Sequence, residues 1–158
     1  MANDLTGYLS RSVLSIFKSL VHSALFNREQ RSFLLRAMKN AEKASAKRKK
    51  AEKQGTHIPP FLIASITPDC NLSCKGCYAR ANAEKEPHCG EDMLAVDDWR
   101  RIFAEAEEMG VSFILLAGGE PFLHRDVLAL AGEFPKLIFP IFTNGTLFKR
   151  ENIAILCR

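Results

Sequence analysis

The chain has 158 residues, of which 47% are hydrophobic and 25% are charged, and its formal net charge is +4. This composition is typical of a folded globular protein with enough apolar material for a core, and it argues against a disordered or fibrous chain. No apolar run approaches the roughly 18 residues of a membrane-spanning helix, and the N-terminus lacks the pattern of a signal peptide, so we expect a cytoplasmic protein.

Residues 1–57 predict a helical extension without strand signals. Apolar side chains recur with a 3.6-residue period over Leu5–Ala24, opposite a polar face, which is typical of an amphipathic helix. A second helix is predicted at about Arg28–Lys53, where ten Lys or Arg residues stand against three Glu residues. Gly55 and the prolines that follow it end this helix.

The basic helix is the only segment whose charge favours a polyanion or a lipid surface. A solvated helical face is the simpler interpretation of its charge run, which peaks at Lys47–Lys50. The amphipathic helix before it raises the alternative of contact with a membrane surface through residues 1–53, and hence of a peripheral membrane location. We expect no specific nucleic-acid binding.

Residues 58–158 change to alternating strands and helices. Apolar runs predict three strands, at Phe61–Thr67, Val111–Ala117 and Leu137–Phe142. Helices are predicted between and after them, at Asp97–Met109 (with Asp97 as N-cap and Gly110 as C-terminal stop), Arg125–Phe134 and Phe148–Arg158. Apolar strands separated by helices predict a parallel sheet, in which ligands bind beyond the carboxyl ends of the strands.

Three cysteines follow the first predicted strand, with the spacing C-x3-C-x2-C: Cys70, Cys74 and Cys77. Thiolates are soft ligands that suit zinc or an iron–sulfur cluster. Structural zinc normally takes four protein ligands, so a zinc site here would need completion by His88 or Cys89. A cubane cluster held by three cysteines instead leaves one iron free to bind a cofactor or substrate.

The other two predicted strands also end in distinctive motifs. The sequence GGEP at Gly118–Pro121 combines glycines, which let a backbone approach a ligand closely, with the carboxylate of Glu120. By itself this sequence is also a plausible turn. The sequence TNG at Thr143–Gly145 ends the third strand, where Asn144 either reaches into the site or serves as a left-handed turn residue.

These motifs, in this order on successive strand ends, resemble the radical S-adenosylmethionine (radical SAM) superfamily over Phe61–Arg158. The resemblance implies an α/β fold, the N-terminal half of a partial (β/α)6 TIM-like barrel with three β/α units, preceded by the helical extension. It implies a 4Fe-4S cluster on the three cysteines Cys70, Cys74 and Cys77. It also implies SAM contacts from five residues: Tyr78, Gly118, Gly119, Glu120 and Asn144. For Tyr78, packing under the cysteine loop is the alternative.

In the family, a flavodoxin or ferredoxin-type donor reduces the cluster, which cleaves SAM to a 5′-deoxyadenosyl radical. That radical abstracts hydrogen from a substrate, here an unknown peptide or small molecule. This chemistry needs no general base in its first step, so no catalytic side chain is predicted. Because three of six strands are present, we expect an incomplete fragment with weak or no turnover. The alternative is a non-catalytic module that binds zinc or an iron–sulfur centre through its cysteines.

Overall fold

The computed structural model describes residues 27–79 and 93–156 of the chain. Contacts divide the chain into two compact units, Met1–Lys39 and Asn40–Arg158. The amphipathic helix expected at Leu5–Ala24 lies outside the described residues. A domain boundary after residue 57 stays a prediction, as does membrane contact through the extension. Within the described part, no helix is long and apolar enough to span a membrane.

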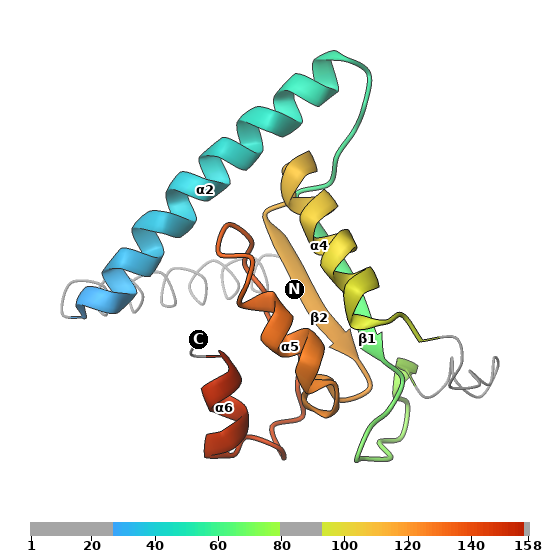
Figure 1. Cartoon of the computed structure of the whole chain (residues 1–158). Helices are drawn as coiled ribbons and strands as arrows, with labels where there is room; N and C mark the ends of the chain where they lie inside the picture. Colours follow the sequence, from blue (N-terminus) through green and yellow to red (C-terminus); the bar gives the residue numbers. More distant parts are fainter. Residues whose placement is uncertain (1–26, 80–92, 157–158) are drawn as a thin grey trace, which may run out of the picture. The chain divides into compact units, whose positions relative to one another are not determined.

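Two parallel strands form the sheet, as predicted. Strand β1 spans Phe61–Thr67 and β2 spans Phe113–Gly118. Their register runs from Phe61 opposite Phe113 to Thr67 opposite Gly118, with one irregularity near the end of β1. The strands lie side by side in Figure 1, so their carboxyl ends reach the same edge of the sheet.

The prediction of a continuous third strand at Leu137–Phe142 is wrong. This segment joins β2 through two isolated parallel bridges, Phe113 with Ile138 and Leu116 with Ile141. Pro140 lies between them, and its carbonyl accepts from Leu116 N at 2.8 Å. Proline has no N–H to donate in return, so one bond of the ladder is missing. The segment still runs alongside β2 and carries its end to the same edge.

Helix α4 spans Val96–Met109, and its ends show one correct and one wrong prediction. Gly110 closes the helix with a φ of 99°, as expected. The N-cap is Ala95 instead of Asp97, and the carboxylate of Asp98 accepts from Ala95 N at 3.0 Å. Hydrogen bonds from Arg101 and from this backbone N–H lower the pKa of Asp98.

The remaining helices are shorter than the sequence predicts. Helix α5 spans Arg125–Ala131 and ends before Phe134, because the N–H groups of residues 132–134 bond three residues back. A 3-10 turn, η2, spans Pro121–Leu123 just ahead of it. Helix α6 spans Arg150–Leu156, and the last two residues of the expected helix lie outside the described part. Strand β2 starts two residues late, because Val111 N bonds back into α4.

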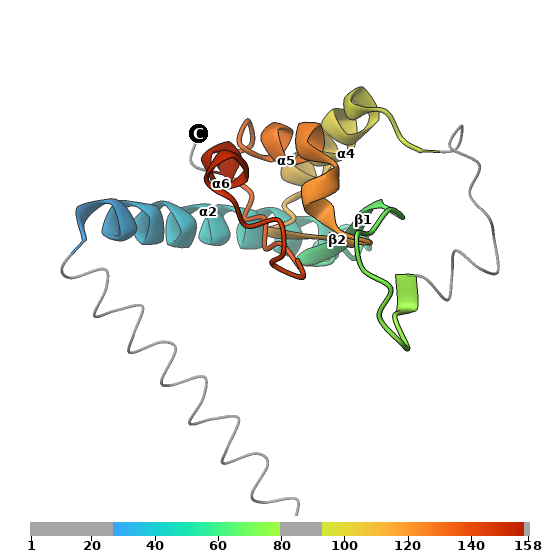
Figure 2. The same ribbon diagram turned by 90° about the horizontal axis from the view of Figure 1, so that it is seen from below.

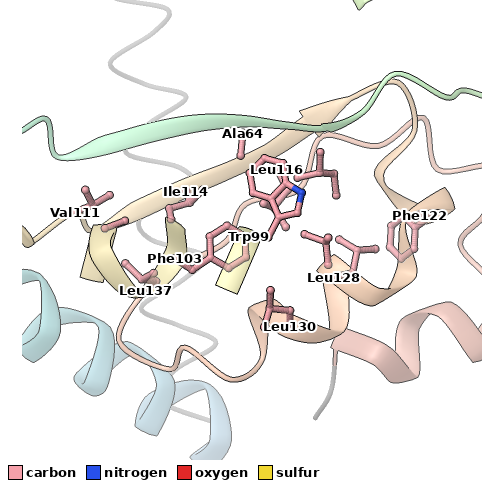
Figure 3. Packing of buried hydrophobic residues seen from close by; sticks show 13 residues of the cluster. Ala64, Trp99, Phe103, Val111, Ile114, Leu116, Phe122, Leu128, Leu130 and Leu137 are labelled. Carbon is pink, nitrogen blue, oxygen red and sulfur yellow. The ribbon is translucent and has the colours of Figure 1, made fainter. Parts of the chain in front are cut away.

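The core lies between the sheet and the helices α4 and α5, which cover one face in Figure 2. Phe103, Leu116 and Val127 are fully buried at its centre. Phe103 contacts the ring of Phe139 at a centroid distance of 4.9 Å, and Figure 3 shows it beside Trp99. Aromatic and aliphatic burial of this kind supplies most of the stability of the fold.

The opposite face of the sheet is apolar and exposed. Phe61 and Ile63 on β1 are 56% and 61% exposed, and Phe113 on β2 is 40% exposed. Phe61 and Phe113 are register partners, so they share this face. The alternation of exposed and buried positions along β1 therefore means that only one side of the sheet is covered by the described residues.

Helix α2 spans Arg28–Lys53, as predicted, and two cations in its second half bind the carboxyl-terminal end of α4. Lys47 Nζ donates to the carbonyls of Glu107 and Glu108, at 3.1 Å each. The Arg48 guanidinium donates to the carbonyl of Gly110 and to Ser112 Oγ. Carbonyls at the end of a helix lack intrahelical partners, and cations satisfy them well. Part of the basic run therefore has a packing role.

Replacing Arg48 should measure this role. Arg48→Ala removes donors from two groups near the start of β2, so we expect the free energy of unfolding to fall by about 1–2 kcal/mol. Lys49→Ala is the matched control, since it deletes one positive charge from an exposed position of the same helix. Urea denaturation followed by circular dichroism gives both values. Equal losses from the two variants would contradict the packing role.

Candidate functional site

A pocket of about 410 Å³ lies where the two strands and the bridged segment end. This volume is within the usual range for small-molecule and cofactor sites. The pocket is lined by three groups of residues, which follow β1, end β2 and follow the bridged segment: Cys70, Leu72, Cys74, Cys77 and Tyr78; Ala117, Gly118 and Gly119; Ile141, Phe142, Thr143 and Asn144. The parallel sheet thus brings together motifs that lie far apart in sequence.

The three cysteines are free thiols on one loop. Cys70 and Cys74 are exposed and Cys77 is half-buried. Cys70 Sγ accepts from Leu72 N at 3.4 Å and from the Asn144 side-chain amide at 3.9 Å. Gly76 adopts a φ of +78°, and this turn brings Cys77 N to 3.4 Å from the Cys74 carbonyl. A glycine between the second and third cysteines therefore has a conformational reason.

The two glycines that end β2 permit close contact with the chain that leads into the cysteine loop. Gly119 N donates to Thr67 O and Glu120 N donates to Asp69 O, both at 2.7 Å. A Cβ on Gly119 would lie 2.0 Å from Asp69 O, and one on Gly118 would lie 2.3 Å from Thr67 O. These distances are far below van der Waals contact, so side chains there would push the loop away. The glycines serve the backbone of the loop as well as the pocket.

Glu120 lies behind the pocket and is fully buried. Its Oε1 accepts from Phe122 N at 3.1 Å and from Thr143 Oγ1 at 2.8 Å. Its Oε2 accepts from Asn144 N at 2.8 Å. Three donors offset the cost of removing a carboxylate from water. The GGEP turn and the TNG turn are therefore joined by one side chain.

Asn144 connects the TNG turn to the cysteine loop. Its side-chain amide donates to Asn71 Oδ1 at 2.9 Å, and its Oδ1 accepts from Thr146 N at 2.9 Å. Asn71 in turn donates to Thr146 Oγ1 at 2.7 Å. Sequence reasoning missed Asn71 and Thr146. Asn71 lies more than 70 residues from both Asn144 and Thr146, and only the fold brings them together.

Seven of the eight residues proposed from the sequence line the pocket: Cys70, Cys74, Cys77, Tyr78, Gly118, Gly119 and Asn144. Glu120 is the eighth and supports the pocket from behind. Over residues 27–79 and 93–156, no group of three or more His, Cys, Asp or Glu side chains is placed to hold a single metal ion. His88 and Cys89, the candidates for completing a zinc site, lie outside the described residues.

Comparison with known proteins identifies a match over this part of the chain. A sequence profile of the radical SAM superfamily matches residues 64–158. The matched region contains the second half of β1, the cysteine loop and every residue that lines the pocket.

Individual relatives are similar over the same region. The GTP 3′,8-cyclase of Syntrophomonas wolfei is 30% identical over 92 residues, which is 56% of this chain and 28% of that protein. The PqqA peptide cyclase of Rhodopseudomonas palustris is 29% identical over 63% of this chain and 26% of its own length. The Fe-coproporphyrin III synthase of Methanosarcina barkeri is 32% identical over 58% and 23%. The chain thus spans about a quarter of the length of these relatives.

A side chain at Gly119 should destabilise the site. Gly119→Ala places a Cβ against Asp69 O, so we expect a loss of about 1–3 kcal/mol in the free energy of unfolding. Gly132→Ala is the control, because its Cβ would meet only Ala129 O, at 3.3 Å, and its φ is −65°. Thermal or urea unfolding measures both. A Gly119→Ala variant as stable as the control would show that the backbone contact is not a constraint.

Proposed function

The chain belongs to the radical SAM superfamily, and on that premise we propose that it binds a 4Fe-4S cluster through Cys70, Cys74 and Cys77 and binds SAM in the adjoining pocket. When bound and reduced, such a cluster supplies the electron that cleaves SAM to methionine and a 5′-deoxyadenosyl radical, which abstracts hydrogen from a substrate.

One observation carries this proposal: the ends of β1, of β2 and of the bridged segment supply one pocket. The first gives three free thiols, the second gives Gly118 and Gly119, and the third gives Asn144. Soft thiolates suit an iron–sulfur centre, and the pocket beside them has the volume of a cofactor site. A zinc ion would need its ligands to converge on one point, whereas each cysteine of a cluster binds a different iron.

The residues of the pocket fit the two cofactors in different ways. Cys70 Sγ accepts hydrogen bonds from two N–H groups, and N–H donors of this kind commonly bond the sulfur ligands of iron–sulfur clusters. At the end of β2, the N–H groups of Gly119 and Glu120 are already bonded to the loop before Cys70. The turn can therefore offer only carbonyl oxygens, which suit the ammonium group of SAM, a donor without lone pairs. Tyr78 is more than half exposed and presents its ring to the same pocket.

Substrate and electron donor belong to the protein as a whole. The names of the three relatives refer to GTP, to the PqqA peptide and to Fe-coproporphyrin III, so they select no single class of substrate. We propose a peptide or small-molecule substrate and a flavodoxin or ferredoxin-type donor. The chain matches about a quarter of the length of those relatives, and the cofactor pocket lies within the matched part.

Anaerobic reconstitution with iron and sulfide tests the proposal. We expect about four irons and four sulfides per chain, because three thiolates and SAM complete the ligand set of a cubane. Cys70→Ala, Cys74→Ala and Cys77→Ala should each abolish stable cluster uptake, as measured by iron and sulfide analysis and electron paramagnetic resonance. Addition of SAM to the reduced wild-type protein should change that spectrum.

Cys89→Ala is the control variant and should retain the cluster. One tightly held zinc ion in place of iron and sulfide, lost in Cys89→Ala, would overturn the proposal in favour of a non-catalytic metal module. A cluster whose spectrum does not respond to SAM would contradict the proposed SAM binding but not the proposed cluster binding.

A further inference from the structure

The buried carboxylate of Glu120 joins the end of β2 to the TNG turn. It is 0% exposed and has donors on both oxygens: Phe122 N and Thr143 Oγ1 on one, Asn144 N on the other. An ionised carboxylate only accepts hydrogen bonds, so it matches three donors without conflict. The Glu120 side chain does not line the pocket itself, but it bonds two residues that do, Thr143 and Asn144.

What Glu120 fixes is the position of Asn144. Backbone N–H of Asn144 is held by Glu120 Oε2 at 2.8 Å, and the side-chain amide extends to the cysteine loop. There it donates to Asn71 Oδ1 at 2.9 Å and lies 3.9 Å from Cys70 Sγ. A chain of hydrogen bonds therefore runs from the buried carboxylate, through Asn144, to the residue next to Cys70 and to Cys70 itself.

We propose that Glu120 is a positioning residue that sets the conformation of the cysteine loop and the N–H donation to Cys70, acting through Asn144. This inference rests on the proposed function only for its consequence at the cluster. The contacts that carry it belong to the chain itself. It differs from a role for Glu120 as a direct SAM contact, which would require the carboxylate to face the pocket.

The consequence at the cluster follows from general chemistry. Hydrogen bonds to the sulfur ligands of an iron–sulfur cluster stabilise the reduced, more negative form and raise its reduction potential. Asn144 supplies such a donor to Cys70 Sγ. Loss of the Asn144 side chain should therefore lower the reduction potential. Loss of the Glu120 carboxylate that holds Asn144 should lower it too.

Glu120→Gln is the sharpest variant. It keeps the shape of the side chain but places an NH2 group opposite one of the three donors, so one hydrogen bond becomes a clash of two donors. Asn144→Ala removes the connecting side chain from an exposed position and should fold even if Glu120→Gln does not. Glu133→Gln makes the same chemical change at an exposed glutamate that pairs with Arg100, and is the matched control.

The first measurement uses the full-length, metal-free protein and 15N relaxation. We expect the backbone order parameters of residues 70–77 to fall in Glu120→Gln and in Asn144→Ala, toward the values below about 0.6 that mark flexible backbone, and to stay unchanged in Glu133→Gln. A fall confined to residues 143–146, with the cysteine loop as ordered as in wild type, would overturn the inference. This result does not depend on whether a cluster binds.

The second measurement uses reconstituted protein without SAM. We expect Glu120→Gln and Asn144→Ala to lower the midpoint potential, and the double variant to lower it no further than the larger single change, because both act on one donor. An unchanged potential in Glu120→Gln together with weakened SAM binding would instead assign Glu120 to direct SAM contact. Failure of wild type to take up a cluster would overturn the proposed function, while the relaxation result would still decide the positioning role.

Discussion

Close approach of two backbones at the end of β2 is the constraint on which the rest of the site depends. Gly119 N and Glu120 N donate to Thr67 O and Asp69 O at 2.7 Å, and a Cβ on Gly119 would overlap Asp69 O. Asp69 directly precedes Cys70, so these bonds fix the point at which the cysteine loop leaves the sheet. The absence of two side chains therefore places three thiols beside the end of the neighbouring strand.

A second set of contacts holds the same loop from the other side. Glu120 contributes its N–H to the segment before the cysteines and its carboxylate to Thr143 and Asn144. Asn144 then bonds Asn71 inside the loop. The bonds of Glu120 involve backbone or its buried carboxylate, whereas the Asn144–Asn71 bond joins two exposed side chains. Glu120 thus connects the ends of β1, β2 and the bridged segment, although its side chain does not line the pocket.

Sequence alone predicted the features that local patterns encode. An apolar run between prolines gives β1 its observed bounds, Phe61–Thr67, and motifs that directly follow apolar runs mark the strand ends that form the pocket. The prediction failed where the outcome depends on a distant group. Pro140 lacks the N–H that a third strand would donate to β2, and the partners of Glu120 lie 23 and 24 residues away. Asn144 and Asn71 are 73 residues apart, and no local sequence pattern predicts a hydrogen bond between them.

The basic half of α2 acts at the end of β2 that is farther from the pocket. Lys47 and Arg48 bond the last carbonyls of α4 and the residues that lead into β2, while Gly118, where the strand ends, lines the same pocket as the cysteines. Exposed carbonyls at a helix terminus carry partial negative charge, so they give these two cations partners without any external polyanion. The charge run that dominates the sequence thus supports the start of the strand. At the other end of β2, the position of the cysteine loop depends on backbone hydrogen bonds and on the buried carboxylate of Glu120.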